Sequence, residues 1–345
     1  MNADAPGKFL GGRLVVFGAG YVGGAVAREA AARGMRVTAL TRNPETARGL
    51  AEAGVDTVVG ELADDAWHGR IAGRGADFVL NCVGAGGGGL EGYRKSYVDG
   101  MRSVAGWAAK MRGRAGAGQS GIGAGIGVLV YTGSTAVYPQ SGGAVVGEEA
   151  PCGERAAGGD GRARWLLEAE RLAFAMQAEG TARGVAVLRL AGIYGPGRHQ
   201  LLDTLRDGAD ALPGRGDYYM NLVHRDDIAG AIWAAFSSPE AQGVFNIADD
   251  SAATRGELCG WLARQLGRPA PRFSGVAAVG RRGALLHRLI DNRRAKAQLG
   301  WRLRYPTFRE GYAPILSRLL GGGRDGEGGG GFGGGRDGCR GSVGG

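Results

Sequence analysis

A glycine-rich segment near the N-terminus is the part of the sequence best suited to chemistry. Gly18-Ala19-Gly20-Tyr21-Val22-Gly23 has the spacing G-x-G-x-x-G, follows the apolar run at 14–17 and precedes an Ala-rich stretch. Between a strand and a helix, these glycines allow a tight turn, close approach of a pyrophosphate and close helix packing. The helix N-terminus adds free N–H groups that attract phosphate. We therefore predict that Gly18, Gly20, Tyr21, Val22 and Gly23 bind a dinucleotide; a tight turn without a ligand is the less favoured alternative.

The residues that end the next apolar run, at 36–41, bear on the choice of dinucleotide. Enzymes that use NAD usually carry an acid at this point to bind the ribose hydroxyls. This chain has Thr41-Arg42 instead. A guanidinium matches the geometry of a 2′-phosphate, so NADP is the expected cofactor and NAD the second choice. In the alternative interpretation, Arg42 is simply a solvated side chain.

The elements that must position these residues follow from hydrophobic patterning. We expect strands at 14–17, 36–41, 56–59, 77–82, 128–131 and 185–190, with helices between them. After Gly192 we expect strands at 218–223 and 244–247, and helices at 226–236, 254–266 and 285–299. Alternating strands and helices predict an α/β fold with a doubly wound parallel Rossmann sheet and a smaller C-terminal substrate lobe.

The same pattern gives predicted domain boundaries. Residues 12–190, with 224–248 returning to the sheet, form the NAD(P)-binding domain, and residues 191–223 and 249–318 form the small lobe. Glycine is the unusual feature of the composition, with 70 of 345 residues, and 15 of these lie in Gly321–Gly345. Such a segment buries too little surface to offset its ordering entropy, so residues 319–345 are predicted to be a disordered tail. Gly113–Gly127 is predicted to be a flexible surface insertion.

Composition limits the classes of partner. The net charge of +9 comes almost wholly from scattered Arg residues without a basic block, so nucleic acid is the less favoured partner. The four cysteines and four histidines show no disulfide framework and no metal-ligand spacing, so no metal is expected. No apolar run spans a membrane and no signal peptide is visible. We expect a cytoplasmic protein, or an organellar one, as in the plastid stroma, if a presequence is missing. A homodimer is compatible with the sequence.

Several later segments, in order, resemble the extended short-chain dehydrogenases/reductases, the group of NAD-dependent epimerases and dehydratases. The resemblance is strongest to an atypical branch with the bacterial YeeZ-like proteins. The segments are Gly60-Glu61-Leu62, Tyr131–Tyr138, Arg189–Arg198, Asn221–Ala229, Phe245-Asn246-Ile247 and Leu299-Gly300-Trp301. Glu61 departs from the usual Gly-Asp-Leu. The resemblance implies cofactor contacts by Glu61, Leu62, Cys82, Val83, Gly84, Gly192 and Ile193, and a small-molecule substrate in the cleft between the lobes.

The catalytic Tyr-x-x-x-Lys pair of this family is missing. The resemblance places Arg162 at the Tyr position and Leu166 at the Lys position. No shift of the alignment restores the pair, because the residues four before Lys8, Lys95, Lys110 and Lys296 are Asp4, Glu91, Gly106 and Asn292. The remaining candidates near the nicotinamide are Ser134 and Thr135 as hydrogen-bond donors, Tyr138 as proton donor and Arg162 as the cation that lowers its pKa.

Two functions therefore stay open. The first is an atypical NADP-dependent oxidoreductase or epimerase-like enzyme with a non-standard proton donor. The second is a catalytically silent dinucleotide-binding redox sensor or scaffold, with RNA as one conceivable partner. For the first function, Tyr138→Phe should lower turnover about a hundredfold. His199 and Tyr194 are the next donors to test, whereas His224 is expected to be structural.

Overall fold

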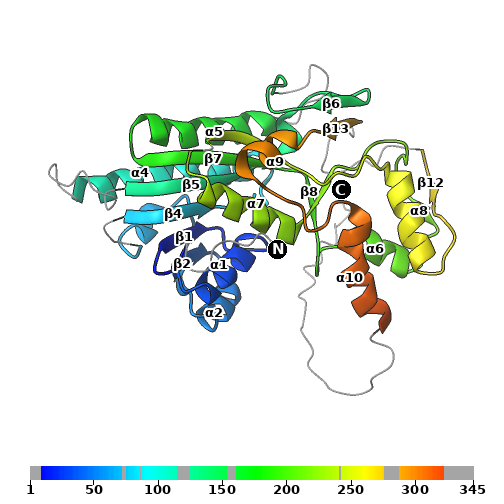
Figure 1. Ribbon diagram of the computed structural model, residues 1–345, viewed down its shortest axis with the longest axis horizontal. Coiled ribbons are helices and arrows are strands. Elements are labelled where there is room, and N and C mark those ends of the chain that lie inside the picture. Colours follow the sequence, from blue (N-terminus) through cyan, green and yellow to red (C-terminus); the bar gives the residue numbers. More distant parts are fainter. Residues whose placement is uncertain are drawn as a thin grey trace, which may run out of the picture.

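A parallel β-sheet forms the centre of the molecule (Figure 1). The computed structural model describes residues 9–71, 75–85, 87–114, 125–153, 161–240, 242–275 and 287–321. Seven strands pair in the order β11-β7-β5-β4-β1-β2-β3, all parallel. They are β1 (Arg13–Phe17), β2 (Arg36–Thr41), β3 (Asp56–Val59), β4 (Gly75–Asn81), β5 (Gly125–Ser134), β7 (Ala182–Leu190) and β11 (Gly243–Ile247). The predicted α/β fold with a doubly wound parallel sheet is confirmed.

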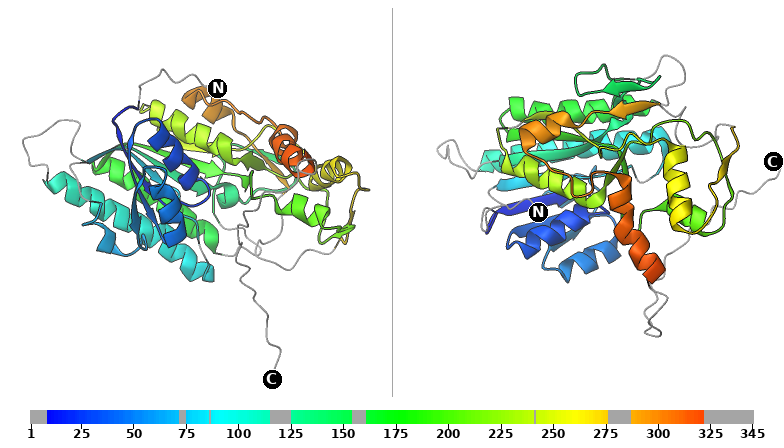
Figure 2. Two further views of the ribbon diagram at one scale, coloured as in Figure 1. Left: turned by 90° about the horizontal axis from the view of Figure 1, so that it is seen from below. Right: turned by 45° about the vertical axis from the view of Figure 1, so that its right-hand side comes forward.

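Helices cover both faces of this sheet because its strands are apolar on both sides. Leu14 and Val16 of β1 belong to a buried cluster with Val26 of α1 (Gly23–Ala32) and Ile232 of α7 (Arg225–Ser237). Val15 and Phe17 point to the other face, where the buried cluster includes residues of α4 (Gly100–Arg114) and α5 (Arg162–Ala178). The two layers of helices lie on opposite sides of the sheet in Figure 2. This arrangement fixes the carboxyl ends of the strands at one edge.

Local sequence signals set several helix ends. Gly34 adopts a φ of +79° directly after α1 and allows the chain to reverse. Helix α2 (Pro44–Ala51) begins after Asn43, whose side chain accepts hydrogen bonds from Glu45 N and Thr46 N. Helix α8 (Arg255–Gln265) begins with a capping box between Thr254 and Glu257.

A second group of elements packs beside the sheet and holds its own apolar cluster. It contains α6 (Gln200–Arg206), α8, α10 (Phe308–Gly321) and the short pair β9 (Ala211–Leu212) and β12 (Arg272–Phe273). Its core includes Leu205, Leu262 and Phe308. The pair β8 (Gly192–Tyr194) and β10 (Leu222–His224) joins it to the sheet. The exact lobe boundaries remain a prediction.

Several predicted elements need correction. The helix expected at 285–299 is wrong in its first part, because β13 (Arg288–Ile290) pairs with β6 (Ala144–Val146) and only α9 (Arg293–Leu299) is helical. The Asn221 side chain donates to Arg288 O and accepts from Ile290 N, so it bonds this segment as a neighbouring strand would. The strand expected at 218–223 is confined to β10.

The remaining short elements lie in the connections. They are η1 (Asp65–Trp67), α3 (Gly89–Tyr93), the π-helical η2 (Arg94–Asp99) and η3 (Thr135–Val137). Most of the predicted glycine-rich insertion, residues 115–124, and of the predicted tail, residues 322–345, lie outside the described residues. Helix α10 extends to Gly321, past the predicted start of the tail at 319. None of the described helices is long and apolar enough to cross a membrane.

Candidate functional site

The phosphate loop between β1 and α1 has the geometry of a ligand cradle. A Cβ on Gly18 would lie 2.7 Å from the backbone of Val83, and one on Gly23 would lie 2.4 Å from Gly18 O. The fold itself therefore requires these two glycines. A Cβ on Gly20, by contrast, would meet nothing within 4 Å. The open space over Gly20 fits the close approach of a pyrophosphate, the feature for which the motif has its middle glycine.

Helix α1 presents its N-terminus to the same space. The helix begins without a side-chain cap and without an acidic residue in its first turn. Its first N–H groups and partial positive charge are thus suited to a phosphate. The loop after β4 lies next to the phosphate loop, and Cys82 N donates to Phe17 O at 2.8 Å. A Cβ on Gly84 would also meet nothing within 4 Å. Burial raises the pKa of the Cys82 thiol, so this side chain lines the site as a neutral group.

Charged residues gather where the adenosine ribose should lie. Arg42 follows β2, and its guanidinium Nη1 lies 3.7 Å from Glu61 Oε2. Lys95 of η2 approaches the same oxygen, also at 3.7 Å. Thr41 is buried, and its hydroxyl accepts from Asn43 N. Two cations that share one carboxylate form a site where a 2′-phosphate could compete with Glu61. Sequence reasoning missed Lys95, because only the fold brings η2 beside the end of β3.

The end of β5 carries the predicted hydrogen-bond donors. Ser134 Oγ accepts from Ala136 N at 3.1 Å. Thr135 is buried, and its hydroxyl donates to Leu190 O at 3.3 Å. Arg288 donates to Thr135 O at 2.7 Å and to Tyr138 O at 2.6 Å. Arg288 thus fixes the loop after β5, and Ser134 is the better placed of the two hydroxyls to meet a bound molecule.

Tyr138 does not have the environment of a proton donor. Its side chain is fully buried, its hydroxyl donates to Asn246 Oδ1 at 2.8 Å, and it accepts from Arg189 Nη1 at 2.8 Å. Burial raises the pKa of Tyr138 although Arg189 opposes this. Arg189 is held in turn by the buried carboxylate of Glu170 at 2.7 Å. These contacts favour a structural role for Tyr138, and the cation bonded to its hydroxyl is Arg189. The proton-donor role of Tyr138, with Arg162 as its cation, stays a prediction.

The first turn of α5 carries Arg162 and Leu166, which we predict to align with the family's catalytic Tyr and Lys. Arg162 lies over the ring of Tyr93, 5.2 Å from its centroid. Leu166 is buried in the apolar cluster under the helix. Tyr93 packs on Tyr97 with ring centroids 5.3 Å apart, and the Tyr97 hydroxyl accepts from Ala85 N at 3.4 Å. Burial raises the pKa of Tyr97 to about 12. These tyrosines, four residues apart on one helical face, connect Arg162 with the loop after β4.

The other predicted donors each have close neighbours of their own. The Tyr194 hydroxyl is buried against α10, where a Cβ on Gly311 would lie 1.9 Å from it. His199 Nδ1 lies 3.0 Å from Asp203 Oδ2. His224 is buried and accepts from Asp226 N at the start of α7, so it caps this helix as expected of a structural histidine. Gly192 and Ile193 are partly exposed in β8 at the carboxyl edge.

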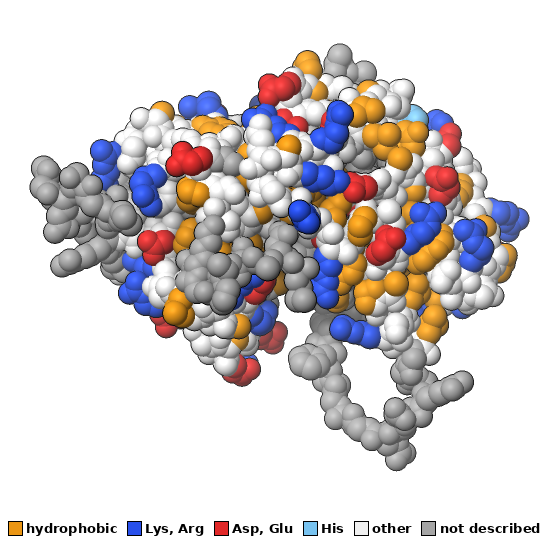
Figure 3. Space-filling model, viewed as in Figure 1, with side chains coloured by type: hydrophobic (Ala, Val, Ile, Leu, Met, Phe, Trp, Pro, Cys, Tyr) orange, Lys and Arg blue, Asp and Glu red, His pale blue; other side chains and the backbone are white. Residues whose placement is uncertain are grey.

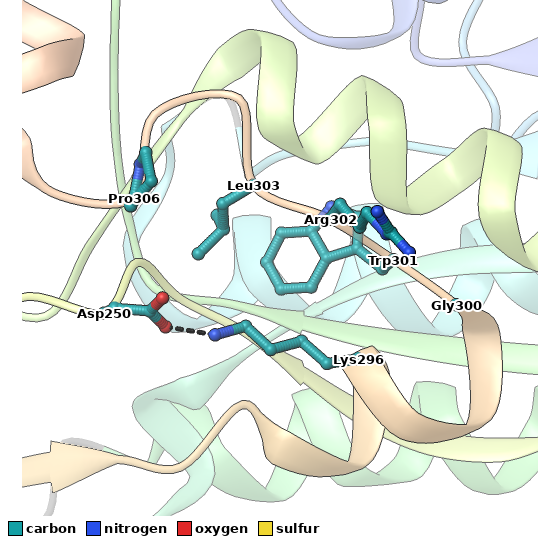
Figure 4. A pocket seen from close by; sticks show the side chains of 7 residues that line it. All are labelled: Asp250, Lys296, Gly300, Trp301, Arg302, Leu303 and Pro306. Atoms are coloured by element: carbon teal, nitrogen blue, oxygen red, sulfur yellow. Dashed lines mark hydrogen bonds and ion pairs between the residues drawn. The ribbon is translucent and has the colours of Figure 1, made fainter. Parts of the chain in front are cut away.

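A separate hollow lies beside the C-terminal end of α9 and is lined by none of the predicted site residues. It measures about 410 Å³ and is lined by Asp250, Lys296, Gly300, Trp301, Arg302, Leu303 and Pro306. Figure 4 shows the Lys296–Asp250 ion pair along one side, with Leu303 and Trp301 opposite.

Among the residues that the structure describes, no cluster of His, Cys, Asp or Glu could hold a metal ion. Lys, Arg, Asp and Glu are interspersed over the face in Figure 3.

Comparison with known proteins agrees with the sheet and the phosphate loop. Residues 14–248 match the model of the NAD dependent epimerase/dehydratase family. The chain belongs to this family and has the extended short-chain dehydrogenase/reductase fold.

Among individual relatives, the chain is a distant homologue of protein YeeZ of Escherichia coli (strain K12), with 33% identity over 122 residues, 35% of this chain and 41% of YeeZ. It is also 33% identical over 164 residues, 43% of this chain, to the 3-diazoavenalumate denitrifying reductase of Streptomyces sp, of which 51% is covered. The matches thus span about half of these relatives or less.

Solved structures give the same fold over most of the chain. A functionally unknown conserved protein from Silicibacter pomeroyi DSS superposes with a TM-score of 0.65, 26% identity and coverage of 90% of this chain and 99% of the other. MoeE5, in complex with UDP-glucose and NAD, superposes with a TM-score of 0.72 at 24% identity, with the same coverage of both chains. The second likeness supports the fold alone.

Proposed function

We propose that this protein is an NADPH-dependent reductase whose substrate accepts a hydride without help from a phenol. The observation that carries the proposal is the open space over Gly20 in the phosphate loop. The predicted alignment of Arg162 and Leu166 with the family's Tyr and Lys supports a reaction without a phenol. Arg42 and Lys95 favour the 2′-phosphate of NADP over NAD. The dinucleotide would lie along Gly18–Gly23, the loop at 82–84 and β8.

The missing phenol narrows the substrate class. Bound NADPH would supply a hydride. An aryl diazonium group could accept it as the C–N bond breaks, a C–H bond forms and N₂ leaves, so that no proton would be needed. The name of the Streptomyces relative, a denitrifying reductase of a diazo compound, supports an acceptor of this kind. A carbonyl, in contrast, needs a proton at its oxygen.

Arg162 and Ser134 have complementary tasks in this scheme. The guanidinium of Arg162, the first residue of α5, binds a carboxylate of the substrate and orients it. The ring of Tyr93 beneath it provides an apolar surface for an aromatic body. Ser134 holds its hydroxyl at the edge of β5 and orients the reacting end of the substrate by a hydrogen bond.

The test uses NADPH deuterated at the transferred position and two acceptors, a carboxylated benzenediazonium and a carboxylated benzaldehyde. The expected result is one deuterium in the arene and little or no reduction of the aldehyde. Arg162→Gln should lower kcat/KM for the diazonium at least about tenfold, since a charge-assisted bond is lost. The neighbouring Arg164→Gln is the matched control, and a reaction without protein measures the uncatalysed rate.

The alternative function is a catalytically silent dinucleotide-binding protein. It is supported by burial: among the described residues, three candidate proton donors are inaccessible to a substrate, namely Tyr138, Tyr194 and His224. If NADPH binds while neither acceptor is reduced above the uncatalysed rate, this second function replaces the first.

A further inference from the structure

The side chain of Tyr21 in the phosphate loop contacts a second loop, residues 194–198. We call residues 194–198 the substrate-facing loop. The hydroxyl of Tyr21 donates to Pro196 O at 3.0 Å, across 175 residues of sequence. The backbone of Tyr21 lies beside Gly20, where the pyrophosphate should pass. A single residue therefore touches both the proposed cofactor site and the loop that borders the substrate cleft.

The substrate-facing loop is shaped to receive this phenol. Gly195 has a φ of +146°, which a residue with a side chain rarely adopts. A Cβ at Gly195 would lie 2.8 Å from the Tyr21 hydroxyl and 3.2 Å from His224 Nε2. The loop is closed by two backbone hydrogen bonds between Gly195 and Arg198, of 3.2 and 3.0 Å. The loop can hold this contact because residue 195 is a glycine, which leaves room for the Tyr21 hydroxyl.

Two guanidinium groups hold the ring of Tyr21. Arg198 of the same loop lies 5.5 Å from the ring centroid, and Arg225, the first residue of α7, lies 5.4 Å from it. Arg225 is itself fixed by Asp226 at 2.9 Å. Both guanidinium groups lie within the range at which a cation is attracted to an aromatic face. The ring is therefore held by three segments: the phosphate loop, the substrate-facing loop and the start of α7.

We propose that Tyr21 is a positioning residue that couples dinucleotide binding to ordering of the substrate-facing loop. The coupling rests on the proposed function, because it needs a dinucleotide in the phosphate loop. A pyrophosphate on the backbone at 20–22 fixes Tyr21, so the contacts with Pro196 and Arg198 are made more of the time. By linkage, ordering the loop must strengthen dinucleotide binding by the same factor.

The test measures amide hydrogen exchange of residues 193–199 by mass spectrometry, with and without saturating NADPH. In the wild type, NADPH should slow exchange in this segment about tenfold. In Tyr21→Phe, which keeps the ring but loses the bond to Pro196, most of this protection should be lost. Tyr219→Phe is the control for removal of a hydroxyl elsewhere. A second measurement is calorimetric: Arg198→Ala should weaken NADPH binding several-fold, and the exposed Arg215→Ala should not.

The outcomes separate the coupling from the proposed function. If the wild type does not bind NADPH, both are overturned. If the wild type binds NADPH and Tyr21→Phe keeps the full protection at saturation, the coupling alone is overturned. Loss of protection in Tyr21→Phe, together with weaker binding in Arg198→Ala but not in Arg215→Ala, supports the coupling.

Discussion

Arg162 is the residue at which we predict the largest chemical departure of this chain from its family. A phenol at this position exchanges a proton, whereas a guanidinium keeps its proton at any physiological pH. Leu166, which we predict at the position of the family's Lys, is buried. The two positions therefore carry no acid and base that could act together as the family's Tyr and Lys do. A cation at the first turn of α5 favours a substrate with an anionic group and disfavours acid catalysis.

We expect the choice between NADP and NAD to depend on Arg42. We expect Arg42→Ala to weaken NADPH binding about tenfold and to leave NADH binding unchanged, because only NADPH carries the 2′-phosphate that the guanidinium binds. Calorimetric titration of both cofactors measures this difference. Arg48→Ala, an exposed change on α2, is the matched control. Equal losses for the two cofactors would remove Arg42 from the ribose site.

Tyr138 gives a prediction about stability. Tyr138→Phe removes a buried hydroxyl that bridges Arg189 and Asn246. Since both partners lose a hydrogen bond, the free energy of unfolding should fall by about 1–3 kcal/mol, while cofactor affinity should stay unchanged. Denaturant unfolding and calorimetry give the two quantities, with Tyr219→Phe as control. A hundredfold loss of turnover in a fully folded Tyr138→Phe protein would restore the proton-donor role.

At the scale of elements, helix α10 can pack closely on Tyr194 because residue 311 is a glycine. A Cβ at Gly311 would lie 1.9 Å from the Tyr194 hydroxyl, whereas at Gly260 in α8 the nearest atoms are 3.5 Å and 3.8 Å away. Gly311→Ala should therefore lower stability by about 1–3 kcal/mol through overpacking. Gly260→Ala should be neutral or raise it by up to ~1 kcal/mol. Thermal unfolding of both variants is the measurement, and equal effects would contradict this packing.

The turn after β11 carries a pH-dependent carboxyl group. Asp249 is buried; burial, with the carboxylates of Asp250, Asp227 and Glu310, raises its pKa to about 8. Because the folded pKa lies above the unfolded one, the stabilising protonated form is present at low pH and is lost as pH rises toward 8. Asp249→Asn should raise Tm by several degrees at pH 8 and by less at pH 5. A gain that is equal at both pH values would show that this carboxyl does not titrate in the folded protein.

For the whole molecule, the sequence predicted the sheet and the phosphate loop well, because both follow from local patterns. Strand β3 and helix α7 were placed within a residue. The errors fell where distant contacts decide the structure. Residues 288–290 form a strand because β6 and the Asn221 side chain bond their backbone. Local patterns likewise could not show that Arg189 and Asn246 reach the Tyr138 hydroxyl from β7 and β11.

The central claim is that the phosphate loop is built for a dinucleotide and not only for the fold, and Gly20 tests it most directly. In the protein alone a Cβ at Gly20 meets nothing within 4 Å. Calorimetric titration of Gly20→Ala with NADPH should therefore show binding weakened at least about tenfold, because the added methyl group occupies the path of the pyrophosphate. Its Tm should equal that of the wild type, and the control Gly49→Ala should bind normally. Wild-type affinity in a normally folded Gly20→Ala protein, or no NADPH binding by the wild type, would contradict the account.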